Sequence, residues 1–140
     1  MKIKFLLLIL LFSNSAFSSY KFETVLDDLG DAWSFVFLSE DRILFTEMSG
    51  KLKIASLSNK FINEIDGTPL VQYSGQGGLS DLALDPDFES NNTIYLSYSA
   101  KDQNKSTTLF LISAELNGNS LENSKIIFQA KAPRRSPMHL

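Results

Sequence analysis

Two successive groups of short alternating apolar runs are the feature that most constrains the fold of this chain. The first group reads WSFVFL (33–38), RILFTEM (42–48), KLKIASL (51–57) and KFINEI (60–65). The second group reads LSDLAL (79–84), TIYLSYS (93–99), TLFLISAEL (108–116) and KIIFQ (125–129). Runs of this length that alternate with period two and are rich in Val, Ile, Phe, Tyr and Thr predict β-strands. The chain is therefore expected to be all-β.

The two groups are related as copies of one unit. Phe35 aligns with Leu82 at an offset of 47 residues, and Ile43 aligns with Ile94 at an offset of 51 residues. The connectors SED and SG within the first group have hairpin length, so consecutive strands are expected to pair antiparallel. Four-stranded antiparallel units of this period are typical of β-propeller blades, which stack in rings of four to eight. Two blades do not close a ring, so the sequence predicts an incomplete propeller and missing C-terminal blades.

The first 18 residues, MKIKFLLLILLFSNSAFS, have the pattern of a secretory signal peptide. Lys2 and Lys4 form a basic start, residues 5–12 are an unbroken apolar run, and small residues follow. The apolar run is shorter than the roughly 20 residues that span a bilayer. We expect a secreted, periplasmic protein with no membrane segment after cleavage.

Charge and composition exclude several function classes. Without Lys2 and Lys4, 11 Lys and Arg face 16 Asp and Glu, so the formal charge is -5. An acidic chain lacks the clustered cations that bind phosphate, so no nucleic-acid partner is expected. Cysteine is absent, which excludes disulfides and thiolate metal sites. A single histidine and no G-x-S-x-G motif leave little basis for a nucleophilic triad.

Residues 130–140, AKAPRRSPMHL, contain two prolines and no alternation. They are expected to form an irregular tail at a point of truncation, because no closing strand follows KIIFQ. The expected organisation is thus a signal peptide (1–18), two blades (19–129) and this tail.

The segment SGQGGL (74–79) holds an amide between glycines directly before a predicted strand. Gly75, Gly77 and Gly78 permit a sharp turn and close backbone approach, which can aim Gln76 toward the central channel of a propeller. A side-chain amide both donates and accepts hydrogen bonds, which suits the oxygen atom of a ligand. In the alternative interpretation the glycines only form a hairpin and Gln76 faces solvent.

Asp81, Asp85 and Asp87 could suggest a calcium loop. Their order does not match an EF-hand, and Asp85-Pro86 is a common turn start, so turn and capping roles are favoured. No metal ligand is predicted in this chain.

The ordered series WSFVFLSEDRILFTEMSGKLKI, GQGGLSDLALDPDFESNNTIYLSYS and KIIFQ closely resembles the N-terminal part of soluble, pyrroloquinoline-quinone (PQQ)-dependent aldose sugar dehydrogenases, the glucose/sorbosone dehydrogenase family. The resemblance covers about residues 29–129. It implies a six-bladed propeller, export to the periplasm, and oxidation of the C1 hydroxyl of an aldose to a lactone with hydride transfer to PQQ. It also implies PQQ and calcium as cofactors, with most of their binding residues beyond the second blade.

The resemblance implies roles for two residues. Gln76 corresponds to an active-site amide beside cofactor and substrate. His139 lies 11 residues after Phe128, close to the position of the family's general base, although SPMHL departs from the family pattern around that histidine. The alternative function is a truncated or non-catalytic propeller fragment that serves only in binding or has no function.

Overall fold

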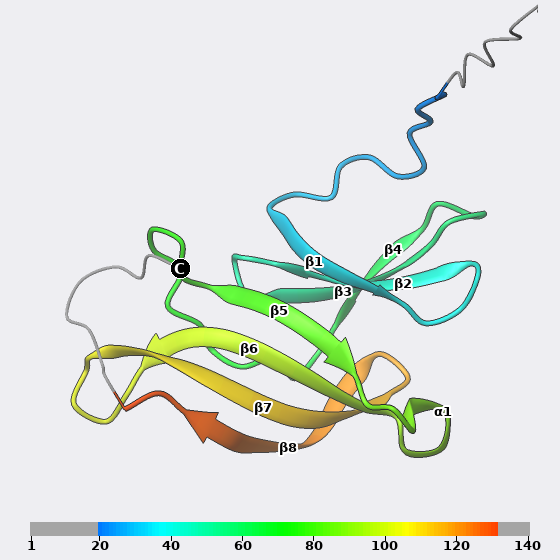
Figure 1. Cartoon of the computed structure of the whole chain (residues 1–140). Coiled ribbons are helices and arrows are strands. Elements are labelled where there is room, and N and C mark those ends of the chain that lie inside the picture. The colour runs from blue at the N-terminus through cyan, green and yellow to red at the C-terminus, as the bar shows by residue number, and fades with distance from the viewer. Residues whose placement is uncertain (1–19, 132–140) are drawn as a thin grey trace, which may run out of the picture.

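The computed structural model describes residues 20–131, which form two four-stranded antiparallel sheets (Figure 1). The strands are paired in the order β1-β2-β3-β4 in one sheet and β5-β6-β7-β8 in the other. Their bounds are β1 Ala32–Phe37, β2 Arg42–Glu47, β3 Lys51–Ser56, β4 Ile62–Ile65, β5 Leu79–Leu84, β6 Thr93–Lys101, β7 Thr107–Asn117 and β8 Ser120–Gln129. We name these sheets the first blade (β1–β4) and the second blade (β5–β8). The prediction of an all-β chain with two four-stranded antiparallel blades is confirmed.

The structure departs from the sequence prediction by more than two residues in two places. Strand β8 begins at Ser120 rather than at Lys125, because the polar residues after the hairpin still pair with β7, for example Glu122 with Glu115. A single helical turn, α1 Phe88–Asn91, follows the predicted Asp85-Pro86 turn. This turn ends at Asn92, which adopts a left-handed conformation with φ 51°. Within residues 20–131, no helix is long and apolar enough to cross a membrane.

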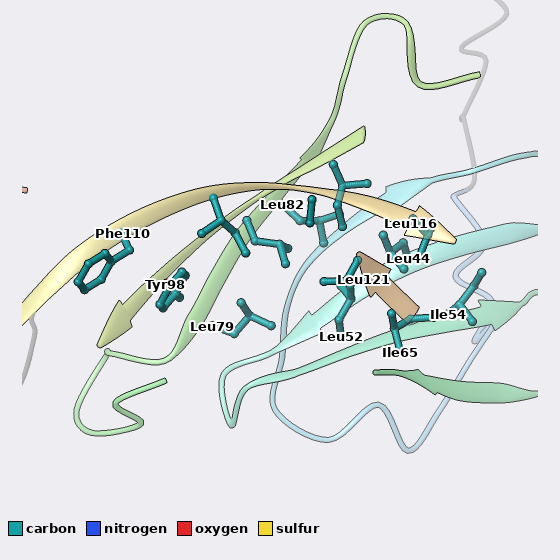
Figure 2. Close-up of a cluster of buried hydrophobic side chains, with 14 residues drawn as sticks. Leu44, Leu52, Ile54, Ile65, Leu79, Leu82, Tyr98, Phe110, Leu116 and Leu121 are labelled. Atoms are coloured by element: carbon teal, nitrogen blue, oxygen red, sulfur yellow. The ribbon is translucent and has the colours of Figure 1, made fainter. Parts of the chain in front are cut away.

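One apolar cluster joins the two blades (Figure 2). The first blade contributes four buried side chains from β2, β3 and β4: Leu44, Leu52, Ile54 and Ile65. The second blade contributes ten from β5 to β8: Leu79, Leu82, Ile94, Leu96, Tyr98, Phe110, Ile112, Ala114, Leu116 and Leu121. Each blade therefore buries one face against the other, as expected for neighbouring propeller blades.

Hydrogen bonds join the two blades along their interface, which we name the seam. They run from the strands that come first in each blade (β1, β2 and β5), named the inner strands, to those that come last (β4 and β8), named the outer strands. At the inner strands, Thr46 Oγ1 donates to the Ser80 carbonyl at 2.7 Å, and Ser34 Oγ donates to the Asp81 carboxylate. At the outer strands, the amide of Leu121 donates to the carbonyl of Asp66 at 2.8 Å. The orientation of one blade on the other is thus set by directional bonds as well as by apolar packing.

The two blades share the same register and the same irregularity at the start of their first strands. Ser34 N donates to Thr46 Oγ1 at 3.2 Å in the first blade, and Asp81 N donates to Ser97 Oγ at 3.0 Å in the second. The pairing shifts register just there in both blades. The repeat predicted from the sequence is therefore a repeat of backbone geometry.

The seam yields a stability prediction. Leu96→Ala, which truncates a fully buried side chain of the shared cluster, should lower the free energy of unfolding by about 2–5 kcal/mol because it leaves a cavity in that cluster. Leu70→Ala, at a side chain that is 94% exposed, should change it by less than about 0.5 kcal/mol. Urea unfolding followed by circular dichroism and by fluorescence provides the measurement. Separate transitions for the two blades would contradict a shared core.

Candidate functional site

The glycine-rich segment before β5 forms a tight two-residue turn. The amide of Ser74 donates to the Gly77 carbonyl at 3.1 Å, and the amide of Gly77 donates back to the Ser74 carbonyl at 3.0 Å. Gly75 occupies the first central position with φ +63°, whereas Gln76 at the second has no positive φ, the pattern of a type II′ turn. The turn therefore places Gln76 at its tip, where the residue is exposed.

Gly77 and Gly78 hold this turn against both blades. A Cβ at Gly77 would lie 2.6 Å from Ser99 Oγ on β6. A Cβ at Gly78 would overlap the carbonyl group of Met48 and lie 2.9 Å from its carbon. These glycines permit close approach, as the sequence predicted: Gly77 approaches Ser99 of the second blade, and Gly78 approaches Met48 at the β2–β3 turn of the first blade.

Backbone hydrogen bonds lock the segment on either side of the turn. The amide of Gln72 donates to the Ser99 carbonyl at 2.7 Å, and the amide of Ser99 donates to the Gly78 carbonyl at 2.9 Å. The amide of Leu79 donates to the Met48 carbonyl at 3.1 Å across the seam. The backbone that carries Gln76 is consequently fixed to strand β6 and to the first blade.

The tyrosine just before the turn forms a hydrogen bond with a distant carboxylate, and the sequence analysis did not single out either residue. Tyr73 OH donates to Asp31 Oδ2 at 2.7 Å, which ties the turn region to the residues just before β1. This hydrogen bond to a carboxylate raises the pKa of Tyr73. The two residues are 42 positions apart, and no local pattern marks either of them.

Of the two predicted site residues, Gln76 lies in the described part of the chain. Gln76 lies on a rigid, exposed turn beside the inner strand β5, which suits a ligand-binding amide, but its role toward cofactor or substrate remains a prediction. His139 lies outside the described residues. The pairing of an amide with a histidine base therefore also remains a prediction.

The aspartates after β5 make local contacts. Asp85 accepts from Tyr95 OH at 2.6 Å, from Asn91 Nδ2 at 3.0 Å and from the Asp87 amide at 2.9 Å. The Tyr95 hydrogen bond, followed by that from Asn91, lowers the pKa of Asp85. Asp85 thus organises the turn that contains α1, in agreement with the favoured turn role. Among residues 20–131, no three His, Cys, Asp or Glu side chains form a group that could hold a metal ion.

Two of the clefts in the described part of the molecule lie away from the turn that carries Gln76. One is an apolar groove of about 460 Å³ between residues 23–29 and the aromatic side chains of β1. The other, of about 520 Å³, lies between Leu70, the β6–β7 loop and the end of β8, and is lined in part by the stacked rings of Tyr98 and Phe110. Gln76 lines neither of these two clefts.

The family model described as Glucose / Sorbosone dehydrogenase matches residues 29–140. The chain is similar to the aldose sugar dehydrogenase YliI of Escherichia coli, with 36% identity over 78 residues, which are 55% of this chain and 21% of the relative. It is also similar to the uncharacterized protein slr1608 of Synechocystis, with 30% identity over 123 residues, or 82% of this chain and 30% of the relative.

Solved structures agree with the fold. A crystal structure of a glucose dehydrogenase superimposes with a TM-score of 0.75 at 30% identity, covering 80% of this chain and 33% of that one. The apo form of the soluble aldose sugar dehydrogenase of Escherichia coli gives 0.74 at 27% identity, covering 79% and 33%. The PQQ-bound aldose sugar dehydrogenase of Streptomyces coelicolor, at 20% identity and 0.64, supports the fold alone. The chain spans about a third of the length of these structures.

The close approach of Gly78 to the Met48 carbonyl predicts a loss of stability when a side chain is added at this position. Gly78→Ala should lower the free energy of unfolding by about 1–3 kcal/mol, because the added methyl group forces the Met48 turn away from β5. Gly118→Ala is the matched control: Gly118 has φ +61° but no atom within 4 Å of its would-be Cβ, so only the backbone strain of about 1 kcal/mol applies. Chemical denaturation of both variants measures the difference. Equal losses would contradict the steric argument.

The Tyr95–Asp85 contact predicts a pH effect. Tyr95→Phe should raise the pKa of Asp85 toward the ordinary value of about 3.9, because the largest stabilising hydrogen bond to the carboxylate is lost. A carboxyl whose pKa is depressed by folding stabilises the protein above its unfolded pKa, and this contribution is lost as pH falls through the folded pKa. The variant should therefore lose less stability to acid from this group. NMR titration of the Asp85 carboxyl, with Tyr73→Phe as the control, tests the assignment.

Proposed function

The chain belongs to the glucose/sorbosone dehydrogenase family, and we propose that it forms the N-terminal part of an exported quinoprotein sugar oxidoreductase. The substrate is an aldose whose C1 hydroxyl is oxidised to a lactone: C1 loses a hydride and the hydroxyl loses a proton. PQQ, when bound, would supply the hydride acceptor. The family match over residues 29–140 is the observation that carries this proposal.

Gln76 supplies orientation in the proposed reaction. Its amide can donate one hydrogen bond and accept another from oxygen atoms of sugar or quinone, without a change of charge. The rigid type II′ turn lowers the entropy lost when such a bond forms, since the backbone is already fixed at Ser99 and Met48. Positioning of this kind favours a reactive geometry before chemistry begins.

His139 is proposed as the general base that takes the C1 hydroxyl proton. An imidazole has an unperturbed pKa of about 6.5, so its neutral form is available at neutral pH. This role comes from the resemblance alone, since the residue lies outside the described part of the chain. Because residues 20–131 contain no metal-binding group of three such ligands, we derive no step from calcium.

Export to the periplasm is part of the proposal. Its support is the basic start, apolar run and small-residue exit of residues 1–18.

A non-catalytic fragment is the second candidate. It is favoured by one observation, which is that the chain spans about a third of the length of its solved relatives. Under this alternative the isolated chain, supplied with PQQ and calcium, does not reduce a dye in the presence of aldoses. Turnover by the isolated chain would contradict it.

The role of Gln76 can be tested in a chimera in which residues 29–131 replace the matching part of the Escherichia coli aldose sugar dehydrogenase. We expect the chimera to oxidise aldoses after reconstitution with PQQ and calcium. Gln76→Ala should lower kcat/KM about 10- to 100-fold, because one or two hydrogen bonds to the reacting molecules are lost. Gln103→Ala, at another exposed amide in the β6–β7 loop, should leave kcat/KM unchanged.

Quinone binding by the same chimera, followed by absorbance, separates misfolding from loss of function. A chimera that binds PQQ and turns over equally with and without Gln76 would overturn the assigned role. A chimera that binds PQQ but oxidises no aldose would overturn the proposed reaction.

A further inference from the structure

We propose that the cleft at one end of the second blade binds a neutral sugar ring, at a site separate from the turn that carries Gln76. This cleft, named the rim cleft, has a volume of about 520 Å³ and lies between Leu70, the β6–β7 loop (102–106) and the end of β8. The loop and the end of β8 lie at the same end of the second blade (Figure 1). The sugar ring is either free or the end of a glycan, and the inference does not rest on the proposed reaction.

The rim cleft forms because the outer strand of the first blade is shorter than that of the second. Strand β4 has four residues, whereas β8 has ten. The connector after β4 is bound first to the start of β8, where the Asp66 amide donates to the Asn119 carbonyl at 2.9 Å. It is bound next to the end of β6, where the Gln72 amide donates to the Ser99 carbonyl at 2.7 Å. Leu70 lies between these two points and forms one wall of the cleft.

The rim cleft lies on the side of the second blade that faces the first. Two of its residues on β8, Ile126 and Gln129, pair with Ile112 and Phe110 of β7, so each pair shares one face of the sheet. Ile112 and Phe110 belong to the cluster that joins the two blades. A further blade of a propeller would pack on the opposite face of β5–β8. The walls of the cleft therefore come from residues 69–129 in a longer protein as well.

A phenol without a hydrogen-bond partner lies in the wall of the rim cleft. Tyr98 is only 6% exposed, and its ring stacks on that of Phe110 at one end of the shared cluster (Figure 2). Among residues 20–131 the Tyr98 hydroxyl has no partner, yet no fully enclosed side-chain oxygen there is left unsatisfied, so this hydroxyl reaches the cleft. Burial raises the pKa of Tyr98, so the hydroxyl keeps its proton at neutral pH and offers a donor to a ligand.

The other polar side chains around the rim cleft favour a neutral ligand. Asn104 and Gln129 present side-chain amides that have no partner among the described residues. Lys101 and Asp102 balance in charge, and Asp102 Oδ1 already accepts from the amides of Asn104 and Ser106 at 2.9 and 2.8 Å. One lysine does not form the paired or bidentate contacts that hold a phosphate or carboxylate. Amides and a phenol suit hydroxyl groups, which both donate and accept hydrogen bonds.

Apolar side chains of the rim cleft complete the match to a sugar ring. Leu70 and Ile126 are 94% and 60% exposed and lie among the polar groups of the lining. A pyranose carries C–H groups on its faces and hydroxyl groups around its edge, so these two side chains contact the faces while the amides and Tyr98 bind the edge. A wholly apolar ligand would cover the Tyr98 hydroxyl and leave it without a hydrogen bond. The volume lies within the range of small-molecule sites, about 300–1,000 Å³.

Calorimetric titration of the whole chain with methyl α-D-glucopyranoside tests the site apart from the reaction, because this probe has no free C1 hydroxyl to oxidise. We expect one saturable site per chain with a millimolar dissociation constant. Tyr98→Phe, which removes the hydroxyl and keeps the ring, should weaken binding about 3- to 10-fold. Asn104→Ala, at an exposed loop residue, should weaken it to a similar extent and replaces Tyr98→Phe if that variant fails to fold by circular dichroism. Tyr95→Phe is the matched control: its hydroxyl is bound to Asp85 and does not line the cleft, so binding should not change.

The chimera described above repeats the measurement with further blades present, because it carries every residue of the rim cleft. It should bind the probe with the same affinity, and Gln76→Ala should leave that affinity unchanged. Maltotriose distinguishes the two sources of the sugar: tighter binding than the monosaccharide probe assigns the cleft to glycan ends, and equal binding assigns it to free sugars. The proposal is overturned if the folded chimera binds neither probe up to about 100 mM, if Tyr98→Phe and Asn104→Ala leave the affinity unchanged, or if Gln76→Ala abolishes binding.

Discussion

The apolar seam between the blades is the contact on which the rest of this structure depends. A four-stranded sheet has two faces, and the larger apolar cluster of this structure is built from both blades. Leu44, Leu52 and Ile54 of the first blade meet β5–β8 in one cluster, and each fully buried Leu or Ile adds about 1.5–3 kcal/mol. No disulfide supplements this packing, because the sequence contains no cysteine. Both blades are therefore expected to form together.

The candidate site depends on the same seam. Only glycine fits at position 78, because the Met48 carbonyl of the other blade occupies the space that a side chain would need. The Leu79 amide bonds that same carbonyl, so the entry into β5 is defined by an inter-blade hydrogen bond. A shift of one blade on the other would move the turn that carries Gln76. Packing far from the amide thus controls where the amide lies.

Local pattern was sufficient to predict most of the fold, and tertiary contact explains what it missed. The short apolar runs at Arg42–Glu47 and Leu79–Leu84 predicted strands and a repeat, although residues 43–47 are all buried rather than alternately buried. The polar residues at the start of β8 show no apolar alternation, and they form a strand because the free edge of β7 pairs with them. Within the site, the glycines predicted the turn, whereas the Tyr73–Asp31 bond joins segments 42 residues apart and has no local signature. His139 lies outside the described residues, so its placement stays a prediction.

The chemistry of the side chains near the turn limits what this part of the chain can contribute to catalysis. An amide such as Gln76 neither titrates near neutral pH nor transfers protons, so it can orient an oxygen atom but cannot act as a base. The nearby carboxylates of Asp31 and Asp81 are hydrogen-bonded to Tyr73 and Ser34, so neither is an uncommitted base. In the proposed reaction, Gln76 therefore positions the sugar, and the proposed base, His139, lies outside residues 20–131.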